Sequence, residues 1–190
     1  MVISVTSTEH LMQVEIREAR LDDAEPIIRI LNPIIEAGVY TALDTPLTVD
    51  AQCEFIKGFP ARGVFVVAVR QTDDRVVGLQ SLEPFASYTH AFDHVGVLGT
   101  YVDLACRRQG IATQLFQATF AAAIRKGYEK AFTFVRADNV AGLQAYLAQG
   151  FVRIGTAARH ARIRGRYVDE VLIEKFLKPH GPSGNLMTSP

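Results

Sequence analysis

Residues 14–20 alternate apolar with charged side chains, a pattern that predicts a β-strand with one solvent-facing side. After this strand, apolar residues recur every three or four positions and predict an amphipathic helix, whose stripe is Ile27, Ile30, Leu31 and Ile34. Asp22 is expected to cap this helix, with Glu25 as the reciprocal partner three residues later. Pro33 is expected to kink or shorten it, because proline lacks an amide hydrogen.

A second, shorter helix is predicted from its N-cap Thr48 to Lys57, with Phe55 and Ile56 facing the interior. The chain then becomes rich in β-branched residues. Two short runs of this kind are joined by a polar turn and predict an antiparallel hairpin, at residues 64–69 and 76–82.

Residues 94–102 are apolar on both sides of the expected strand, which is typical of a central strand covered on both faces. An amphipathic helix follows over residues 111–126 and should stop at Gly127. Residues 130–135 form the next predicted strand. This strand–helix–strand unit predicts a parallel pair joined by a right-handed crossover.

The remaining pattern predicts a short helix over residues 140–149 and a terminal hairpin of residues 151–163 and 167–177. The whole order describes a mixed sheet flanked by helices. One domain is expected over residues 14–178. Residues 1–13 are expected to be a flexible N-terminal segment, and residues 179–190, punctuated by Pro, Gly and Ser, a flexible tail.

Composition narrows the class of protein. Hydrophobic residues make up 48% of the 190 residues, and twenty Lys and Arg balance twenty Asp and Glu. The chain therefore lacks the broad basic field of a nucleic-acid-binding protein. No stretch approaches the ~20 apolar residues of a membrane span, and no secretory signal pattern opens the chain. Because Cys53 and Cys106 show no metal-ligand or disulfide pattern, a reduced cytoplasmic setting is expected.

The turn between the central strand and its helix carries the main chemical signal. It reads Arg107-Arg108-Gln109-Gly110-Ile111-Ala112, followed by Thr113. A helix N-terminus presents unpaired N–H groups and a positive dipole end, and small residues let a phosphate approach the backbone. These features favour a pyrophosphate ligand. A helix cap with solvated arginines is the alternative interpretation of the same residues.

Arg107-x-x-Gly110-x-Ala112 resembles the Gln/Arg-x-x-Gly-x-Gly/Ala signature of the GNAT superfamily of N-acetyltransferases. The similarity extends over residues 14–177, and its further matches are Asn139, Tyr146 and the pair Gly150-Phe151. Residues 81–85 and 159–169 resemble the phosphinothricin-acetyltransferase-like branch. The resemblance implies an α/β fold with a mixed, mostly antiparallel sheet of six or seven strands and four helices. It further implies acetyl-CoA as co-substrate, no metal, and a homodimer.

The resemblance also implies roles for individual residues. The pyrophosphate would lie on the turn from Arg107 to Thr113, and the pantetheine arm would meet the backbone of Tyr101 and Val102, where two strands splay apart. Asn139 and Tyr146 would approach the thioester, with Tyr146 as the acid for the leaving thiolate. From the residues alone, Tyr146 equally fits the apolar core and Asn139 a helix N-cap.

The general base is not evident from the sequence. Some relatives carry a glutamate in the central strand, where this chain has only Val, Leu, Gly and Thr at residues 97–100. Glu83, at the end of the preceding strand, is the candidate base, and Asp93 and His94 are alternatives. Each is also explained as a solvated surface residue.

Two further segments are candidates for contact with the acceptor. The strongest cluster of charge is Arg159, His160, Arg162, Arg164 and Arg166. It either docks an anionic group or forms the solvent-facing side of a hairpin. The segment 39–46 resembles the loop that borders the acceptor pocket in relatives.

These observations predict an acetyl-CoA-dependent N-acetyltransferase acting on a primary amine of a small molecule, such as an amino acid, an amine metabolite or a phosphinothricin-like toxin. Nucleic-acid and membrane partners are not expected. A protein or peptide amine acetyltransferase is one alternative. A non-catalytic acyl-CoA-binding sensor is another, because the central strand lacks the glutamate.

Overall fold

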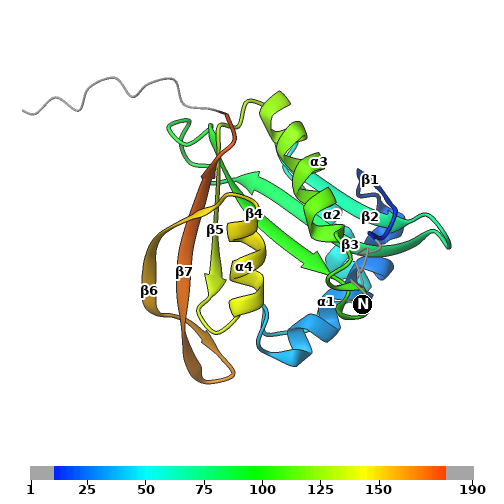
Figure 1. The fold of residues 1–190 in the computed structure, drawn as a ribbon, viewed down its shortest axis with the longest axis horizontal. Coiled ribbons are helices and arrows are strands. Elements are labelled where there is room, and N and C mark those ends of the chain that lie inside the picture. The colour runs from blue at the N-terminus through cyan, green and yellow to red at the C-terminus, as the bar shows by residue number, and fades with distance from the viewer. Residues whose placement is uncertain (1–10, 179–190) are drawn as a thin grey trace, which may run out of the picture.

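The computed structural model describes residues 11–178, which form a seven-stranded mixed sheet with helices on both faces (Figure 1). Along the chain the elements are β1 (Val14–Glu18), α1 (Ala24–Ala37), α2 (Val49–Lys57), β2 (Val64–Arg70), β3 (Arg75–Pro84), β4 (Val95–Val102), α3 (Ile111–Arg125), β5 (Lys130–Arg136), α4 (Val140–Ala148), β6 (Val152–Ile163) and β7 (Arg166–Phe176). Short 3-10 turns precede α1 and α3. The predicted order and type of the strands and helices are confirmed.

The strands lie in the order β1-β2-β3-β4-β5-β7-β6, and every neighbouring pair is antiparallel except β4 and β5. The parallel pair is the one that the strand–helix–strand pattern predicts. The β6–β7 hairpin closes through Arg164 and Gly165, both at positive φ (49° and 80°), as a tight turn between twisted strands requires.

Side chains of the central strands alternate between two apolar layers. In β2, for example, Val64, Val66 and Ala68 pack with α3, whereas Phe65, Val67 and Val69 pack with α1. The helices therefore cover opposite faces of the sheet, with α3 on one face and α1 on the other (Figure 1). Because both faces of β2 and β3 are buried, their sequences are nearly continuous apolar runs.

Backbone pairing between β4 and β5 stops after three residue pairs. The last pair joins Val97 and Phe132, although β4 continues to Val102 and β5 to Arg136. Beyond that point the Leu98 carbonyl accepts a hydrogen bond from the Thr133 hydroxyl at 2.7 Å. A side chain thus occupies the place where a strand-to-strand backbone bond would continue, and the two strands diverge.

Three local predictions need correction. The carboxylate of Asp23, not of Asp22, stabilises the entry to α1, because it accepts from the Arg20 N–H at 2.7 Å and pairs with Arg17. Of the two effects expected of Pro33, a kink or a shorter helix, the second is wrong, because α1 continues to Ala37. Phe55 does not face the interior: it is 41% exposed and packs only edge-on against neighbouring rings. By contrast, the Thr48 cap is confirmed by a 3.2 Å bond from the Ala51 N–H.

Two further predictions concern the ends of the chain. Residues 1–10 and 179–190, both expected to be flexible, lie outside the described residues. The first described residues are tied to the fold, since the Met12 N–H donates to the Gln109 carbonyl at 3.0 Å. In residues 11–178, no helix combines the length and the apolar character needed to cross a membrane.

Candidate functional site

The turn before α3 is shaped by two left-handed residues. Arg108 has φ 59° and Gly110 has φ 75°, and α3 begins at Ile111. The first N–H groups of a helix have no carbonyl one turn earlier to bond, so they point outward at the positive end of the dipole. The turn therefore has the geometry of an anion site, with two arginines beside it.

A cavity of about 340 Å³ opens beside this turn, between the end of β4, the start of α3 and α4. It is lined by ten of the eleven residues that the sequence suggested for the co-substrate: Tyr101, Val102, Arg107, Arg108, Gly110, Ile111, Ala112, Thr113, Asn139 and Tyr146. Gln109 does not line it, and its carbonyl instead holds Met12. We call this space the α3 cavity.

A second cavity, of about 360 Å³, lies across the gap between β4 and β5. It is bordered by residues 40–43 after α1, by Ser81 and Glu83 of β3, and by Glu170 of β7, and we call it the β3–β7 cavity. The two cavities share six lining residues: Tyr40, Thr100, Tyr101, Asn139, Gly142 and Tyr146. Ligands in the two cavities would therefore meet at this shared wall.

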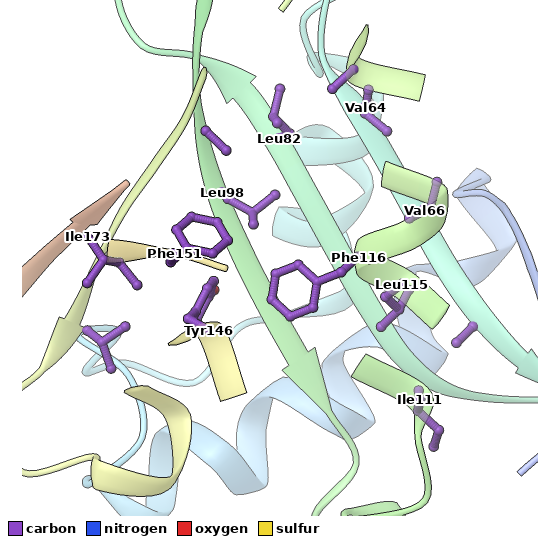
Figure 2. Close-up of a cluster of buried hydrophobic side chains, with 14 of the residues drawn as sticks. Val64, Val66, Leu82, Leu98, Ile111, Leu115, Phe116, Tyr146, Phe151 and Ile173 are labelled. Carbon is purple, nitrogen blue, oxygen red and sulfur yellow. The ribbon is translucent and has the colours of Figure 1, made fainter. Parts of the chain in front are cut away.

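Tyr146 lies in the shared wall and in the apolar core at once. Its ring packs edge-on against Phe116 and Phe151, each at 5.2 Å between centroids, close to Leu98 (Figure 2). Its hydroxyl donates to the Thr100 hydroxyl at 3.0 Å. Burial raises the pKa of Tyr146, so the phenol keeps its proton at neutral pH. Both interpretations of this residue, core aromatic and proton donor, fit its position.

Thr100 is held from its other side by Gln80, whose Nε2 donates to the Thr100 hydroxyl at 2.7 Å. Gln80 is fully buried in β3, and its Oε1 has no hydrogen-bond partner among the described residues. No local sequence pattern marks Gln80 or Thr100, because their contact depends on the pairing of β3 with β4.

Asn139 is confirmed as the N-cap of α4, since its Oδ1 accepts from the Gly142 N–H at 3.0 Å. Its Nδ2 donates to the Tyr40 carbonyl at 3.1 Å. The Arg107 guanidinium lies 4.0 Å from the centre of the Tyr40 ring, a cation–π distance. Tyr40 thus links the turn before α3 to the loop that borders the β3–β7 cavity.

Glu83 is half-buried and lines the β3–β7 cavity. Burial raises the pKa of its carboxyl group, which makes it a stronger base than an exposed glutamate. The alternative candidates for the base, Asp93 and His94, lie in less suitable positions. Asp93 is bonded by His90 and paired with Arg62, and these contacts lower its pKa. Neither Asp93 nor His94 is among the described residues that line the two cavities.

Two buried charged residues that line the same cavity were not predicted from the sequence. Arg136, 6% exposed, donates to the carbonyls of Gly38 and Thr41 at 2.7 and 3.3 Å and forms a two-point pair with Asp138. Glu170, 2% exposed, is its register partner on β7. Neighbouring strands bring them together from positions 34 residues apart, so no local sequence pattern marks them.

The arginine-rich hairpin proves to be largely a solvent-facing surface. Arg159 and Arg162 lie over the Tyr167 ring at 4.3 and 5.7 Å, and Arg164 donates to the carbonyls at the end of α1. None of these side chains is among the described residues that line the two cavities. In residues 11–178 no group of three or more His, Cys, Asp or Glu is arranged to hold a metal ion.

The chain is similar to several proteins that are named as acetyltransferases. A curated Bacillus subtilis (strain 168) protein, "Putative phosphinothricin acetyltransferase YwnH", is 25% identical over 162 residues, which cover 85% of this chain and 98% of that protein. An N-acetyltransferase structure from Staphylococcus aureus Mu50 superposes with a TM-score of 0.80 at 24% identity, covering 87% and 99% of the two chains. A Sinorhizobium meliloti phosphinothricin acetyltransferase, solved in complex with AcCoA, gives 0.79 at 19% identity, covering 87% and 89%.

The fold of these structures confirms the predicted α/β architecture, and the names of the relatives agree with the phosphinothricin-acetyltransferase-like branch. The family model described as "Acetyltransferase (GNAT) family" matches residues 29–151, which include α3 with its preceding turn, β5 and α4. The match spans well over half of the chain. The protein therefore belongs to the GNAT family of acetyltransferases.

Proposed function

We propose that this protein transfers the acetyl group of acetyl-CoA directly to a primary amine of a small molecule. The observation that carries the proposal is the meeting of two cavities at Tyr146, one beside a helix N-terminus and one beside Glu83. The α3 cavity would hold the co-substrate, and the β3–β7 cavity would hold the acceptor.

The residues of the α3 cavity fit coenzyme A. The outward N–H groups at the start of α3, with Arg107 and Arg108, match a pyrophosphate in charge and in donor number. The edge of β4 after Val97 has no backbone partner on β5 among the described residues. That edge offers hydrogen-bonding groups to the amides of a pantetheine chain, in the manner of an added strand.

When bound, acetyl-CoA supplies the thioester that is attacked. Glu83 removes a proton from the acceptor ammonium, because only a neutral amine has the lone pair for the new C–N bond. Backbone N–H groups at the β4 edge stabilise the carbonyl oxygen as it gains charge. Tyr146 gives its proton to the sulfur as the C–S bond breaks, and the second proton that the nitrogen loses in becoming an amide restores the phenol. Its raised pKa keeps that proton available at neutral pH.

Glu83 could also serve as the general base in place of the glutamate that β4 lacks. Its backbone is paired with Val97, so a carboxylate from β3 reaches the place that the β4 residues leave apolar. This placement favours an enzyme over an acyl-CoA sensor. A cavity of about 360 Å³ has the size of a small-molecule site, which favours a metabolite over an extended peptide.

Calorimetry with coenzyme A and a thiol-release assay with acetyl-CoA and an amine panel test the proposal. We expect coenzyme A to bind and Tyr146→Phe to lower kcat by about 10²-fold or more while changing the Kd of coenzyme A little. Tyr128→Phe is the matched control, because Tyr128 is also buried but does not line either cavity. Absence of coenzyme A binding, or equal effects of the two substitutions, would contradict the proposal.

The resemblance implied a homodimer, and the cysteine pattern implied a cytoplasmic location; we retain both as predictions. Sedimentation of the purified protein tests the first. Fractionation of the source cells tests the second.

A further inference from the structure

Three charged side chains project from one face of the sheet into the β3–β7 cavity. Register partners share a face, as do residues two apart on one strand. Glu83 pairs with Val97 and Val97 with Phe132, so Glu83 shares a face with Phe132. Arg136, four residues after Phe132, lies on the same face, and its backbone register partner on β7 is Glu170. Of the described residues that line the cavity, only these three carry charged side chains.

Arg136, the positively charged residue of the three, already has hydrogen-bond partners within the protein. Four of the five N–H donors of Arg136 bond to Asp138 and to the carbonyls of Gly38 and Thr41. Its role is to hold the loop after α1. A substrate carboxylate would therefore find no free guanidinium here, and it would face two carboxylates instead.

Glu170 is buried without a matching donor. Its side chain has no hydrogen bond within residues 11–178, and its one ion pair there is with the His160 Nε2, 4.0 Å away. A buried carboxylate is costly unless a cation or donors accompany it. Burial raises the pKa of Glu170 by more than the charges of His160 and Arg136 lower it, and a cationic ligand beside it would lower it further.

Glu83 and Glu170 stand too far apart to share one ammonium group. They lie three strands apart and four residues apart along the strands. In an ideal sheet that separates their Cα atoms by on the order of 15–20 Å. Each carboxylate therefore calls for its own cation, Glu83 the amine that reacts and Glu170 a second one.

We propose that the acceptor is a dication, an extended amine whose far end carries a second cationic group that is recognised by Glu170. This inference rests on the proposed function and specifies its substrate class. It departs from an amino acid acceptor such as phosphinothricin, whose carboxylate and phosphinate would meet Glu83 and Glu170. Glu170 is then the residue that determines specificity, and it takes no part in bond making.

Matched acceptors test the inference. Two series are suitable: 1,5-diaminopentane, 5-aminopentan-1-ol and 5-aminopentanoate, and the corresponding eight-carbon compounds. Within a series only the charge at the far end changes. We expect kcat/KM to fall from diamine to amino alcohol to amino acid, by about tenfold or more at the first step in at least one series. Glu170→Gln should reduce the ratio of diamine to amino alcohol to near one.

Glu174→Gln is the matched control, because Glu174 lies on the same strand and face but pairs with Lys130 outside the cavity. It should leave the ratio unchanged. A preference for the amino acids, or a ratio that Glu170→Gln does not alter, would overturn the inference while leaving acetyl transfer in place. Should Glu170→Gln fail to fold, Glu170→Asp, which withdraws the charge by one methylene, must lower the ratio.

Binding separates this inference from the proposed function. Calorimetry of the three compounds against the coenzyme A complex measures the same order of affinities without turnover. If coenzyme A binds and no amine is acetylated, the order diamine, amino alcohol, amino acid still supports a dication site. Loss of that order refutes it. If coenzyme A itself does not bind, the proposed function fails, and the inference fails with it.

Discussion

Replacing Arg136 by methionine tests whether a buried guanidinium holds the loop that borders the acceptor cavity. Methionine is similar in length but has no donor, so the carbonyls of Gly38 and Thr41 lose their bonds of 2.7 and 3.3 Å. Hydrogen bonds to a charged group contribute about 1.5–3 kcal/mol each, and the longer bond contributes less. Asp138, with 55% of its side chain exposed, adds little.

The free energy of unfolding should therefore fall by about 2–4 kcal/mol. For a domain of this size, a loss of that magnitude lowers Tm by about 4–16 °C. The freed loop should raise KM for the amine several-fold. The Kd of coenzyme A should change little, because Arg136 does not line the α3 cavity.

Urea unfolding, thermal unfolding and steady-state kinetics measure these quantities. Arg62→Met is the control: Arg62 also pairs with an aspartate and a carbonyl, both of Asp93, but its side chain is 43% exposed. The control should lose little stability and keep the wild-type KM. Equal losses in the two variants, or an unchanged KM in Arg136→Met, would refute the assignment of Arg136 as the anchor of the loop.

Three shorter predictions follow from backbone strain and from carboxyl burial. Gly110→Ala and Gly127→Ala should each lose about 1–2 kcal/mol of stability, because both glycines have positive φ (75° and 89°). Only Gly110→Ala should weaken coenzyme A binding in calorimetry, and equal weakening would count against the turn as the phosphate site. In wild type, kcat/KM should fall as pH drops through the pKa of Glu83, which burial raises above 4.5. A Glu83→Gln variant that keeps this acidic limb would exclude Glu83 as the base. Burial raises the pKa of Glu170 in the folded state, so the native protein binds more protons than the unfolded chain and its stability falls as pH rises through that window. Glu170→Gln should accordingly raise the urea midpoint at pH 7, with no difference below about pH 4; a lower midpoint at pH 7 would contradict this account.

The sequence predicts the elements well wherever one local period governs them. The apolar stripe of α3 and the doubly apolar run of β4 each repeat at the spacing of their structure, so the strand, the turn and the helix could be placed without coordinates. The errors concern single residues, such as the orientation of Phe55 on α2 and the acidic residue at the start of α1. Asp22 and Asp23 are both acidic, and the positions of Arg17 on β1 and of the Arg20 N–H decide which one is bonded.

The same difference between local and long-range patterns applies to the residues of the site. The co-substrate residues are largely contiguous in the sequence, and a turn of seven residues could be recognised as a unit. The β3–β7 cavity, proposed for the acceptor, is formed by residues from several strands. Glu170 and Arg136 meet because β5 pairs with β7 in one particular register, and a shift of one residue would put the two side chains on opposite faces. Register was not evident from the sequence, so these charges could not be placed.

The gap between β4 and β5 is what would allow the proposed co-substrate and acceptor to meet. An uninterrupted parallel ladder would separate the α3 face from the α1 face, because a sheet leaves no passage between paired strands. The Thr133 hydroxyl satisfies the Leu98 carbonyl, so the strands can diverge without leaving that buried acceptor unpaired. The remaining β4 edge is available for a pantetheine chain, which would restore the missing ladder. A sheet with this gap thus supplies both the binding edge for one ligand and the opening to the other.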